Sequence, residues 1–321
     1  MTRHDTVHIA LATDTAYLPW AAVSVLSCQR ATSPCRVHVH VLHEGDLTSD
    51  AQRAFASMVS HECGEVSFHM VEGSRLDAVP SKGPELGGKT SWIRITLADL
   101  LPDLDRIVYL DADTLTVQSV EPLWTEPLGD AGVAAVANVV EPARRGHVAD
   151  LGIEPTQYFN AGVLVMNLQL MRDENTYERV LDCVGERGKE LSWYDQDALN
   201  LVFAGRWHAL HPRWNTQNSL WYWRAWACEV FGERAVHEAL SDPAVVHFEG
   251  PSIVKPWHYL CQHPFRRHYR DVLQMTPWRD APLLERTAAT RVIRRLPQGA
   301  QLPAYGRLQA FRTRHPKWSL S

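Results

Sequence analysis

The sequence of 321 residues contains no long apolar run. Charged residues, His, Pro or Gly interrupt every hydrophobic stretch before it reaches the ~18 to 20 residues that a membrane-spanning helix requires. A transmembrane protein is therefore excluded. The N-terminal segment has Asp5 where a signal peptide would be basic, and it has no long apolar stretch before a small-residue cleavage site. We expect a cytoplasmic protein.

Cysteine is scarce and scattered, with no CxxC pair and no zinc-ligand spacing. This distribution argues against a disulfide framework and suits buried or incidental thiols in a reducing compartment. The six cysteines are Cys28, Cys35, Cys63, Cys183, Cys228 and Cys261.

Acidic residues are missing from the C-terminal segment. Residues 286–321 contain eight Arg or Lys and no Asp or Glu, although the whole chain has a net charge of −5. The main part of the chain is therefore acidic, which argues against a nucleic-acid partner. The basic tail also carries Leu, Ile, Phe and Trp, so we expect either peripheral contact with an anionic membrane or a tail that is solvated or packed on the domain. Pro297, Gly299 and Pro303 argue against one continuous amphipathic helix in it.

Short β-rich runs alternate with amphipathic helical segments from residue 7 onward. This pattern predicts an α/β fold with a mostly parallel central sheet flanked by helices. The predicted strands are 7–13, 36–43, 65–71, 106–110, 132–138, 162–167 and 245–248, the helices 22–28, 48–62, 90–102, 168–187 and 195–203, and the main loops 73–89 and 141–158. The composition turns Arg-rich near Cys261, which predicts a main domain at 1–260 and a basic helical extension at 261–321.

The segment RIVYLDADTLTV, residues 106–117, ends an apolar strand with two carboxylates. Side chains two apart in a strand point the same way, so Asp111 and Asp113 can converge on one cation just past the strand. Open α/β sheets bind their ligands at that end. A polar turn that merely closes the strand is the alternative.

The segment VVHFEGPSIVKPWH, residues 245–258, leads from a strand through His247 into a Gly-Pro loop with Lys255. An imidazole together with two carboxylates and diphosphate oxygens suits Mn²⁺ or Mg²⁺, which leaves Lys255 to neutralise further phosphate charge. The alternative is a histidine satisfied by the backbone, which is the expected state of most of the 16 histidines.

Two further segments carry polar groups beside small or apolar residues. In YFNAGVLVMN, Asn160, Ala161 and Gly162 open an apolar strand, and small residues there permit close approach of a sugar or phosphate. In WYDQDALN, Asp195 and Gln196 stand at a helix start, where capping alone explains part of the pattern.

These segments, in this order, resemble family 8 of the retaining glycosyltransferases, which includes glycogenin and bacterial lipopolysaccharide α-galactosyltransferases and α-glucosyltransferases. The resemblance covers about residues 7–260 and rests on ALATDTAY, WIRITLADLLP, YLDADTLT, FNAGVLVMN, YDQDALN and HFEGP followed by KPWH. It implies a GT-A nucleotide-sugar-binding fold and Mn²⁺, or alternatively Mg²⁺. It also implies transfer of glucose or galactose from a UDP-sugar to a glycan or glycolipid acceptor such as lipopolysaccharide, with retention.

The resemblance also assigns site residues. Asp111, Asp113 and His247 match the metal ligands, and Gly250 and Lys255 match the positions that hold the diphosphate. The nucleotide-binding positions correspond to Ala12, Thr13, Asp14, Tyr17 and Ala112. The positions that act on the donor sugar or line its pocket correspond to Arg94, Asn160, Ala161, Asp195 and Gln196. Asp195 is the nearest carboxylate for a covalent route, and positioning of the acceptor on the departing face is the other route.

Three departures from the family pattern stand out. Ala16 occupies a position that is often Asn, and the region around Leu86 lacks a polar residue that some galactosyltransferases have. The Gly250 to Lys255 loop is longer than usual, which leaves the position of Lys255 open.

Other functions remain as alternatives. A sugar nucleotidyltransferase would be expected to have a Gly-rich phosphate loop after the first strand, and ATDTAYLPW has none. A catalytically silent nucleotide-sugar-binding protein would tend to have lost a metal ligand or Lys255. The Trp-rich segment 213–231 is either core packing or a platform for an acceptor sugar.

Overall fold

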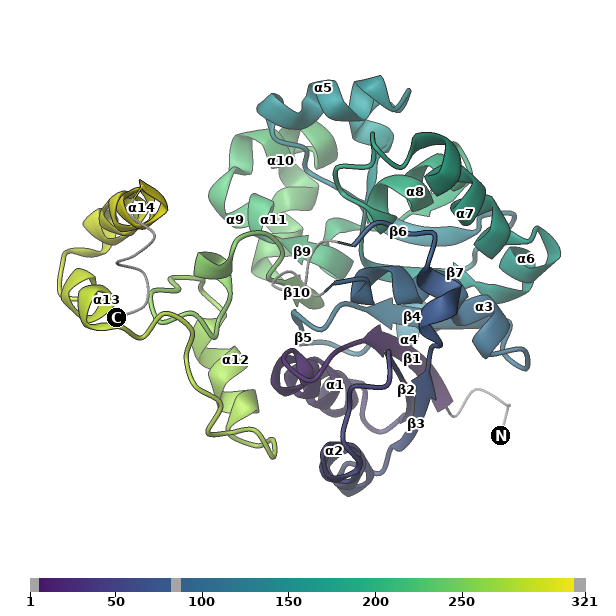
Figure 1. The fold of residues 1–321 in the computed structure, drawn as a ribbon, viewed down its shortest axis with the longest axis horizontal. Helices are drawn as coiled ribbons and strands as arrows, with labels where there is room; N and C mark the ends of the chain where they lie inside the picture. The colour runs from purple at the N-terminus through teal and green to yellow at the C-terminus, as the bar shows by residue number, and fades with distance from the viewer. Residues whose placement is uncertain (1–5, 82–87, 315–321) are drawn as a thin grey trace.

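A seven-stranded sheet forms the centre of the molecule in our computed structural model, which describes residues 6–81 and 88–314 (Figure 1). The strand order is β3-β2-β1-β4-β7-β6-β8. Neighbouring strands run parallel except that β7 is antiparallel to both β4 and β6. The predicted, mostly parallel sheet is confirmed. Its strands are β1 (Thr6–Ala12), β2 (Arg36–His43), β3 (Glu65–Met70), β4 (Arg106–Leu110), β6 (Val133–Ala137), β7 (Phe159–Asn167) and β8 (Trp207–Ala209).

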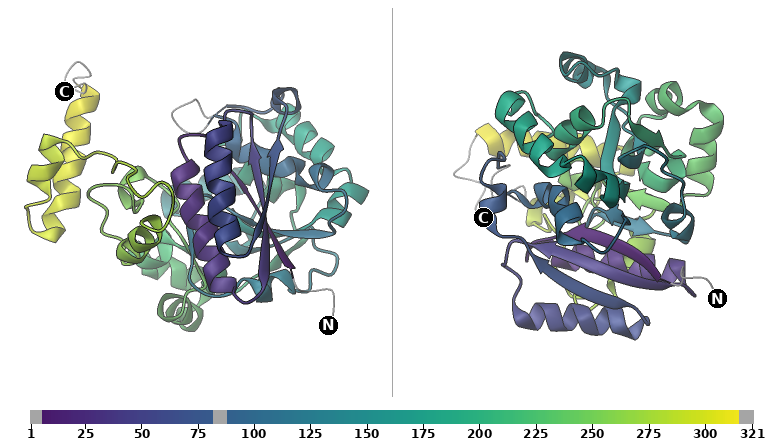
Figure 2. Two further views of the ribbon diagram at one scale, coloured as in Figure 1. Left: turned by 90° about the horizontal axis from the view of Figure 1, so that it is seen from below. Right: turned by 90° about the vertical axis from the view of Figure 1, so that its right-hand side faces the viewer.

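Helices cover both faces of this sheet. On one face, α1 (Leu18–Thr32) and α2 (Ser49–His61) lie side by side and pack on alternate apolar residues of the strands, such as Ile9 and Val39 (Figure 2). On the other face, Tyr109 and Leu164 pack among residues of α6 (Leu168–Asp173), α7 (Thr176–Arg187) and α8 (Asp195–Val202). Burial on both faces explains why most strands read as nearly continuous apolar runs.

A second, three-stranded sheet brings distant segments to the end of β4. Its strands are β5 (Thr114–Thr116), β10 (Val245–His247) and β9 (Thr216–Gln217), in the order β5-β10-β9. β10 runs antiparallel to β5, so that His247 lies opposite Thr114. This pairing places the end of β10 beside the residues that follow β4.

Several predicted boundaries were wrong. The predicted loop 141–158 contains α5 (Pro142–Asp150) and the 3₁₀ helix η4 (Pro155–Gln157), because a proline in the first turn starts each helix without an apolar stripe. The predicted loop 73–89 contains η1 (Gly73–Leu76), and Leu86 lies outside the described residues.

Predicted helices also differ in extent and type. Helix α1 is longer than 22–28, and 90–102 is a 3₁₀ helix, η3 (Thr90–Thr96), followed by α3 (Leu97–Leu100). Helix 168–187 divides into α6 and α7 at Asn175, whose φ is 49°. The remaining elements between β5 and β10 are α4 (Glu121–Trp124), η5 (Pro212–Asn215), α9 (Asn218–Tyr222), α10 (Arg224–Phe231) and α11 (Glu233–Ser241).

The C-terminal segment is helical, as predicted. After η6 (Ser252–Val254), α12 (Arg266–Leu273) packs into the main core through Tyr269 and Val272. By contrast, α13 (Ala288–Ile293) and α14 (Gln298–Arg314) project away from the sheet (Figure 1) and share a small apolar cluster with Leu260. The helical structure is interrupted near Pro297, between α13 and α14, whereas α14 continues through Pro303. The division at residue 260 stays a prediction. Among the described helices, none has both the length and the apolarity to cross a membrane.

Candidate active site

Two aspartates and a histidine meet where β4 and β10 end. One ligand atom from each of Asp111, Asp113 and His247 lies within 4.8 Å of the others. The Nε2 atom of His247 is 3.2 Å from Asp113 Oδ1 and 3.7 Å from Asp111 Oδ2. The structure thus brings together the three residues expected to bind a metal.

A row of asparagines fixes the orientation of His247. The Nδ1 atom of His247 lies 3.0 Å from Asn215 Oδ1, and because a carbonyl oxygen only accepts, Nδ1 carries the proton. Nε2 is therefore the nitrogen left facing the carboxylates, the usual arrangement behind a metal-binding histidine. The amide of Asn215 donates to Asn160 Oδ1 at 2.8 Å, and that of Asn160 donates to Asn138 Oδ1 at 3.1 Å.

Asn215 was not predicted as a site residue, because an Asn inside a Trp-rich segment has no distinctive spacing. Gly162 has a clearer signal, since it is the small residue of the FNAG motif. A Cβ at Gly162 would lie 2.1 Å from Cε1 of His247, so only glycine lets the imidazole lie against β7. The Gly162 carbonyl also accepts from the backbone N–H of Asp111 at 2.7 Å.

Lys255 lies at the carboxylate cluster. Its Nζ forms an ion pair with Asp113, and the residue is only 7% exposed. Burial, the largest single influence, lowers the pKa of Lys255, but the charge and hydrogen bond of Asp113 together with the charges of Tyr17 and Glu249 outweigh it. The pKa of Lys255 is therefore raised, and the ammonium form is favoured. The pKa of Asp113 is lowered because Lys255 and His247 outweigh the effect of burial. The longer loop forms a turn at Gly250, with φ of 87°, and then η6, and it keeps Lys255 at the centre.

Arg94 joins the carboxylate cluster to the start of α8. This buried guanidinium donates to Asp111 Oδ1 at 2.9 Å and pairs through Nε with Asp195 Oδ2 at 3.1 Å. It also donates to the Ala161 carbonyl and lies over the ring of Tyr109, 4.3 Å from the centroid. Burial opposes its charge, but the two carboxylates and Tyr109 raise the pKa of Arg94 above the usual value.

The start of α8 is held by polar side chains. Gln196 Oε1 accepts from the Ala161 N–H at 3.0 Å. Asp197, fully buried, accepts from the Tyr158 hydroxyl and from the backbone of Trp193, at 2.6 and 2.7 Å. Asp197 therefore fixes the loop before α8, while Asp195 turns toward Arg94.

A cavity at the ends of β1 and β4 connects the aspartates with the residues expected at the nucleotide. Its lining consists of Ala12, Thr13, Asp14, Tyr17, Thr90, Ser91, Arg94, Tyr109, Asp111, Ala112 and Asp113. The Asp14 carboxylate accepts from the backbone N–H of Tyr17 at 2.7 Å, and the half-exposed Tyr17 ring meets Trp257 edge-on at 6.0 Å. The cavity thus combines two tyrosine rings, those of Tyr17 and Tyr109, with charged groups of both signs.

A family comparison matches this arrangement. The model of "Glycosyl transferase family 8" matches residues 8–261. The chain belongs to this family. The match spans every segment that builds the site, from β1 to the residues just after Lys255.

Proteins named as lipopolysaccharide glycosyltransferases are among the relatives that this chain matches. General stress protein A of Bacillus subtilis is 33% identical over 196 residues, 59% of this chain and 66% of that protein. Lipopolysaccharide 1,3-galactosyltransferase of Salmonella typhimurium is 25% identical over 287 residues, 87% of this chain and 81% of that protein. The crystal structure of galactosyltransferase LgtC with donor and acceptor sugar analogs matches with a TM-score of 0.75 and 25% identity, over 84% of this chain and 96% of that one. This protein therefore has the GT-A fold of a glycosyltransferase.

Proposed function

We propose that this protein transfers glucose or galactose from a UDP-sugar to a glycan or glycolipid acceptor such as lipopolysaccharide, with retention of configuration. The observation that carries this proposal is the convergence of Asp111, Asp113 and His247 with Lys255 and Arg94 beside one cavity. Relatives named lipopolysaccharide galactosyltransferase and glucosyltransferase support the same class of acceptor.

The ligand atoms of Asp111, Asp113 and His247 suit a hard divalent cation. Two carboxylates and an imidazole whose Nε2 faces them fit Mn²⁺ or Mg²⁺, which supplies charge neutralisation at the diphosphate when bound. Lys255 adds an ammonium group at Asp113, and the Gly250 turn gives the phosphates access to the backbone. As UDP leaves, these fixed positive charges stabilise the negative charge that develops on it.

The residues around Arg94 hold the donor sugar. Ala161 accepts from Arg94 and donates to Gln196, and Asn160 accepts from the backbone N–H of Gly162, so these side chains and the start of β7 form a wall behind Arg94. Asp195 is buried and paired with Arg94, so we assign it to positioning. Retention then depends on holding the acceptor hydroxyl on the face from which UDP departs.

The nucleotide lies against Tyr17 and Asp14 in this proposal, with Ala12, Thr13 and Ala112 along the cavity. Tyr17→Ala removes an interaction common to ground state and transition state, so it should raise the donor KM with a smaller effect on kcat. Steady-state kinetics with varied donor measures this. A fall in kcat at unchanged KM would contradict the assignment of Tyr17.

The acceptor lies toward α9 and the C-terminal extension. Tyr222 and Trp223 are 40% and 41% exposed, and Tyr222 is the last residue of α9. At the other end of this helix, the backbone N–H of Asn218 donates to Glu249, next to the Gly250 turn. On α13 and α14, exposed apolar residues including Val292 and Phe311 stand among arginines. We propose that residues 1–260 form the catalytic domain. Residues 261–321 form an extension that contacts the anionic inner face of the cytoplasmic membrane.

A donor screen tests the function. UDP-glucose, UDP-galactose, UDP-N-acetylglucosamine and GDP sugars are incubated with Mn²⁺, Mg²⁺ or EDTA, and release of nucleoside diphosphate is measured. We expect hydrolysis of UDP-glucose or UDP-galactose that requires the cation. Full turnover in EDTA, or a preference for GDP sugars, would overturn the proposal; binding without hydrolysis would indicate a silent nucleotide-sugar-binding protein.

A truncation tests the membrane contact. Removal of residues 286–321 should abolish salt-sensitive sedimentation with anionic liposomes and leave UDP-sugar hydrolysis intact. Unchanged sedimentation of the truncated protein would refute the role of the extension.

A further inference from the structure

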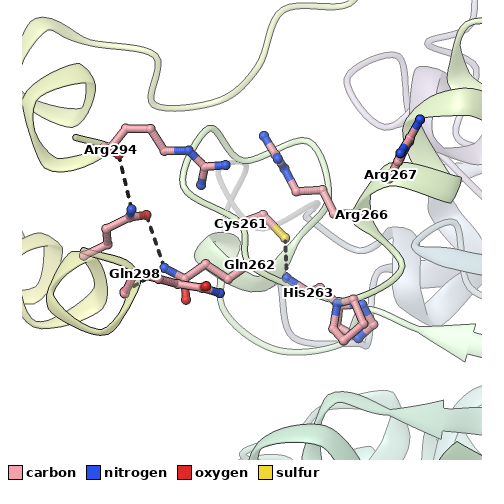
Figure 3. A pocket seen from close by; sticks show the side chains of 9 residues that line it. Cys261, Gln262, His263, Arg266, Arg267, Arg294 and Gln298 are labelled. Atoms are coloured by element: carbon pink, nitrogen blue, oxygen red, sulfur yellow. Dashed lines mark hydrogen bonds between the residues drawn. The ribbon is translucent and has the colours of Figure 1, made fainter. Parts of the chain in front are cut away.

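A second cavity, of about 390 Å³, lies between the start of α12 and the α13–α14 pair. Figure 3 shows the side chains of Arg266 and Arg294 extending toward one another from its two sides. The polar part of the lining also includes Arg267, His263 and the amides of Gln262, Gln298 and Gln301. Its size falls in the range of small-molecule sites.

The arginines of this cavity have no acidic partner within residues 6–81 and 88–314. Among the described residues, no carboxylate forms an ion pair with Arg266, Arg294 or the neighbouring Arg270. Nε of Arg266 and Nη2 of Arg270 are buried and lack a hydrogen-bond acceptor in the part of the chain that the structure describes. Burial, followed by the charges of Arg266 and Arg294, lowers the pKa of Arg270 to about 10. Three guanidinium groups are therefore held together against their mutual repulsion.

His263 adds a neutral donor to the lining. The residue is 2% exposed, and its Nδ1 accepts from the backbone N–H of Phe265 at 3.1 Å. The proton of the neutral ring therefore sits on Nε2, which has no partner among residues 6–81 and 88–314. Buried donors of this kind are normally satisfied, so Nε2 of His263 is a further unpaired polar atom of the lining, although its ring packs against Trp221, Phe248 and Phe265.

The polar floor is fixed in place. Gln301 donates through Nε2 to the carbonyls of Arg294 and Leu296, at 3.2 and 2.9 Å, and so holds the end of α13. Gln262 donates to the Gln298 carbonyl at 3.1 Å and ties α14 to the segment before α12. The spacing of Arg266 and Arg294 is thus set by hydrogen bonds between the elements that carry them.

We propose that this cavity binds a phosphoryl group, clamped by the guanidinium groups of Arg266 and Arg294 with Arg270 beside them. Guanidinium groups match phosphate oxygens in pairs, and an unpaired cluster gains both hydrogen bonds and charge neutralisation from a dianion. The cavity is larger than one phosphate, so the group arrives on a carrier, either a phosphorylated glycan or the headgroup of an anionic lipid. The proposal does not rest on the donor or the metal of the active site.

The first experiment measures inorganic phosphate binding to the full-length, metal-free protein by calorimetry, at constant ionic strength. We expect saturable binding that becomes about 10- to 100-fold weaker in Arg266→Gln and in Arg294→Gln, the loss of one charge-assisted contact. The matched controls are Arg291→Gln and Arg295→Gln, which alter exposed arginines of the same region. Absence of saturable binding, or equal losses in the controls, would overturn the proposal.

A second comparison identifies the carrier. The lipid source predicts that Arg266→Gln and Arg294→Gln lose sedimentation with phosphatidylcholine vesicles that contain phosphatidylglycerol, while both controls keep it. The glycan source predicts that glucose 6-phosphate displaces inorganic phosphate and that vesicle binding is unchanged. The proposed site is wrong if phosphate binds but glucose 6-phosphate does not displace it and the two arginine variants sediment with vesicles like the wild type. Arg294→Lys, which keeps the charge but loses the paired geometry, should fall between wild type and Arg294→Gln even if a Gln variant folds poorly.

Discussion

The active centre and the arginine cavity use cations in opposite ways. In the active centre, Lys255 and Arg94 each face carboxylates at ion-pair distance. In the arginine cavity, Arg266 and Arg294 face one another and no acid among the described residues. The partners decide the direction of the shift, since burial lowers both pKa values, yet the net pKa is raised for Lys255 and lowered for Arg270. One region is electrically balanced by the fold, whereas the other needs a ligand to balance it.

The largest expected effect comes from removing a charge of the active centre. Asp113→Asn takes away both a metal ligand and the partner of Lys255, so glycosyl transfer with Mn²⁺ should fall by roughly 10² to 10⁴. Single-turnover and steady-state rates measure this. Asp103→Asn, in the exposed turn before β4, is the control and should retain wild-type rates. Comparable rates for the two variants would refute the assigned role of Asp113.

A smaller effect is expected at Asn215, which contacts His247 and is itself uncharged. Asn215→Ala removes the acceptor of the His247 Nδ1–H, and such losses typically weaken metal binding about 10- to 100-fold. The Mn²⁺ concentration for half-maximal activity should rise, with less change in kcat at saturating Mn²⁺. Asn215→Asp keeps an acceptor oxygen and should restore much of the affinity. If Asn215→Asp and Asn215→Ala behave alike, the hydrogen bond to His247 is not what matters.

The two regions should differ in how charge removal affects folding. Lys255→Met leaves Asp113 without its cation and should lower stability by on the order of 1 to 3 kcal/mol. Arg266→Met relieves like-charge repulsion and keeps the aliphatic stem, so in phosphate-free buffer it should leave Tm equal or slightly higher. Thermal unfolding followed by circular dichroism tests both. A marked loss of Tm in Arg266→Met would break the contrast between the regions.

The smallest effect concerns acid. Burial lowers the pKa of His263 to about 3, below its ordinary value of 6.5. Between these two pKa values His263 is protonated in the unfolded chain but not in the folded chain, so the stability of the fold decreases as the pH drops below about 6.5. His263→Phe should reduce the loss of Tm between about pH 7.5 and pH 5, whereas replacement of the exposed His237 should not. An unchanged slope in His263→Phe would mean that this imidazole is accessible to protons in the folded state.

The sequence predicted the parts of this molecule that depend on local pattern. Apolar runs at strand spacing predicted the strands of the parallel half of the sheet, and two carboxylates after β4 predicted a cluster that the structure brings together with His247. Strands β5, β8 and β9 have three, three and two residues, too few for any periodicity to be visible. They form because neighbouring segments of the folded chain complete their hydrogen bonds.

Residues whose role depends on a distant partner were not predictable. Asn215 matters because it meets His247, and Arg266 matters because Arg294 lies across a cavity from it. The sequence predicted a basic tail that begins at residue 286, and the arginines at the start of α12 lie before that tail. Only the packing of α13 and α14 brings Arg294 of the tail to the same cavity as Arg266. Family resemblance supplied the active-site residues and gave no indication of this second cluster.

The row of amides behind His247 has a direction. Each link donates away from the imidazole, from His247 to Asn215, from Asn215 to Asn160, and from Asn160 to Asn138. Moving the imidazole proton from Nδ1 to Nε2 would require Asn215 to turn its NH₂ group toward the ring, which would set two carbonyl oxygens against each other unless Asn160 turned as well. Asn160 Oδ1 also accepts from the backbone of Gly162, and the backbone cannot turn. The peptide of β7 therefore dictates which nitrogen of His247 is available for coordination.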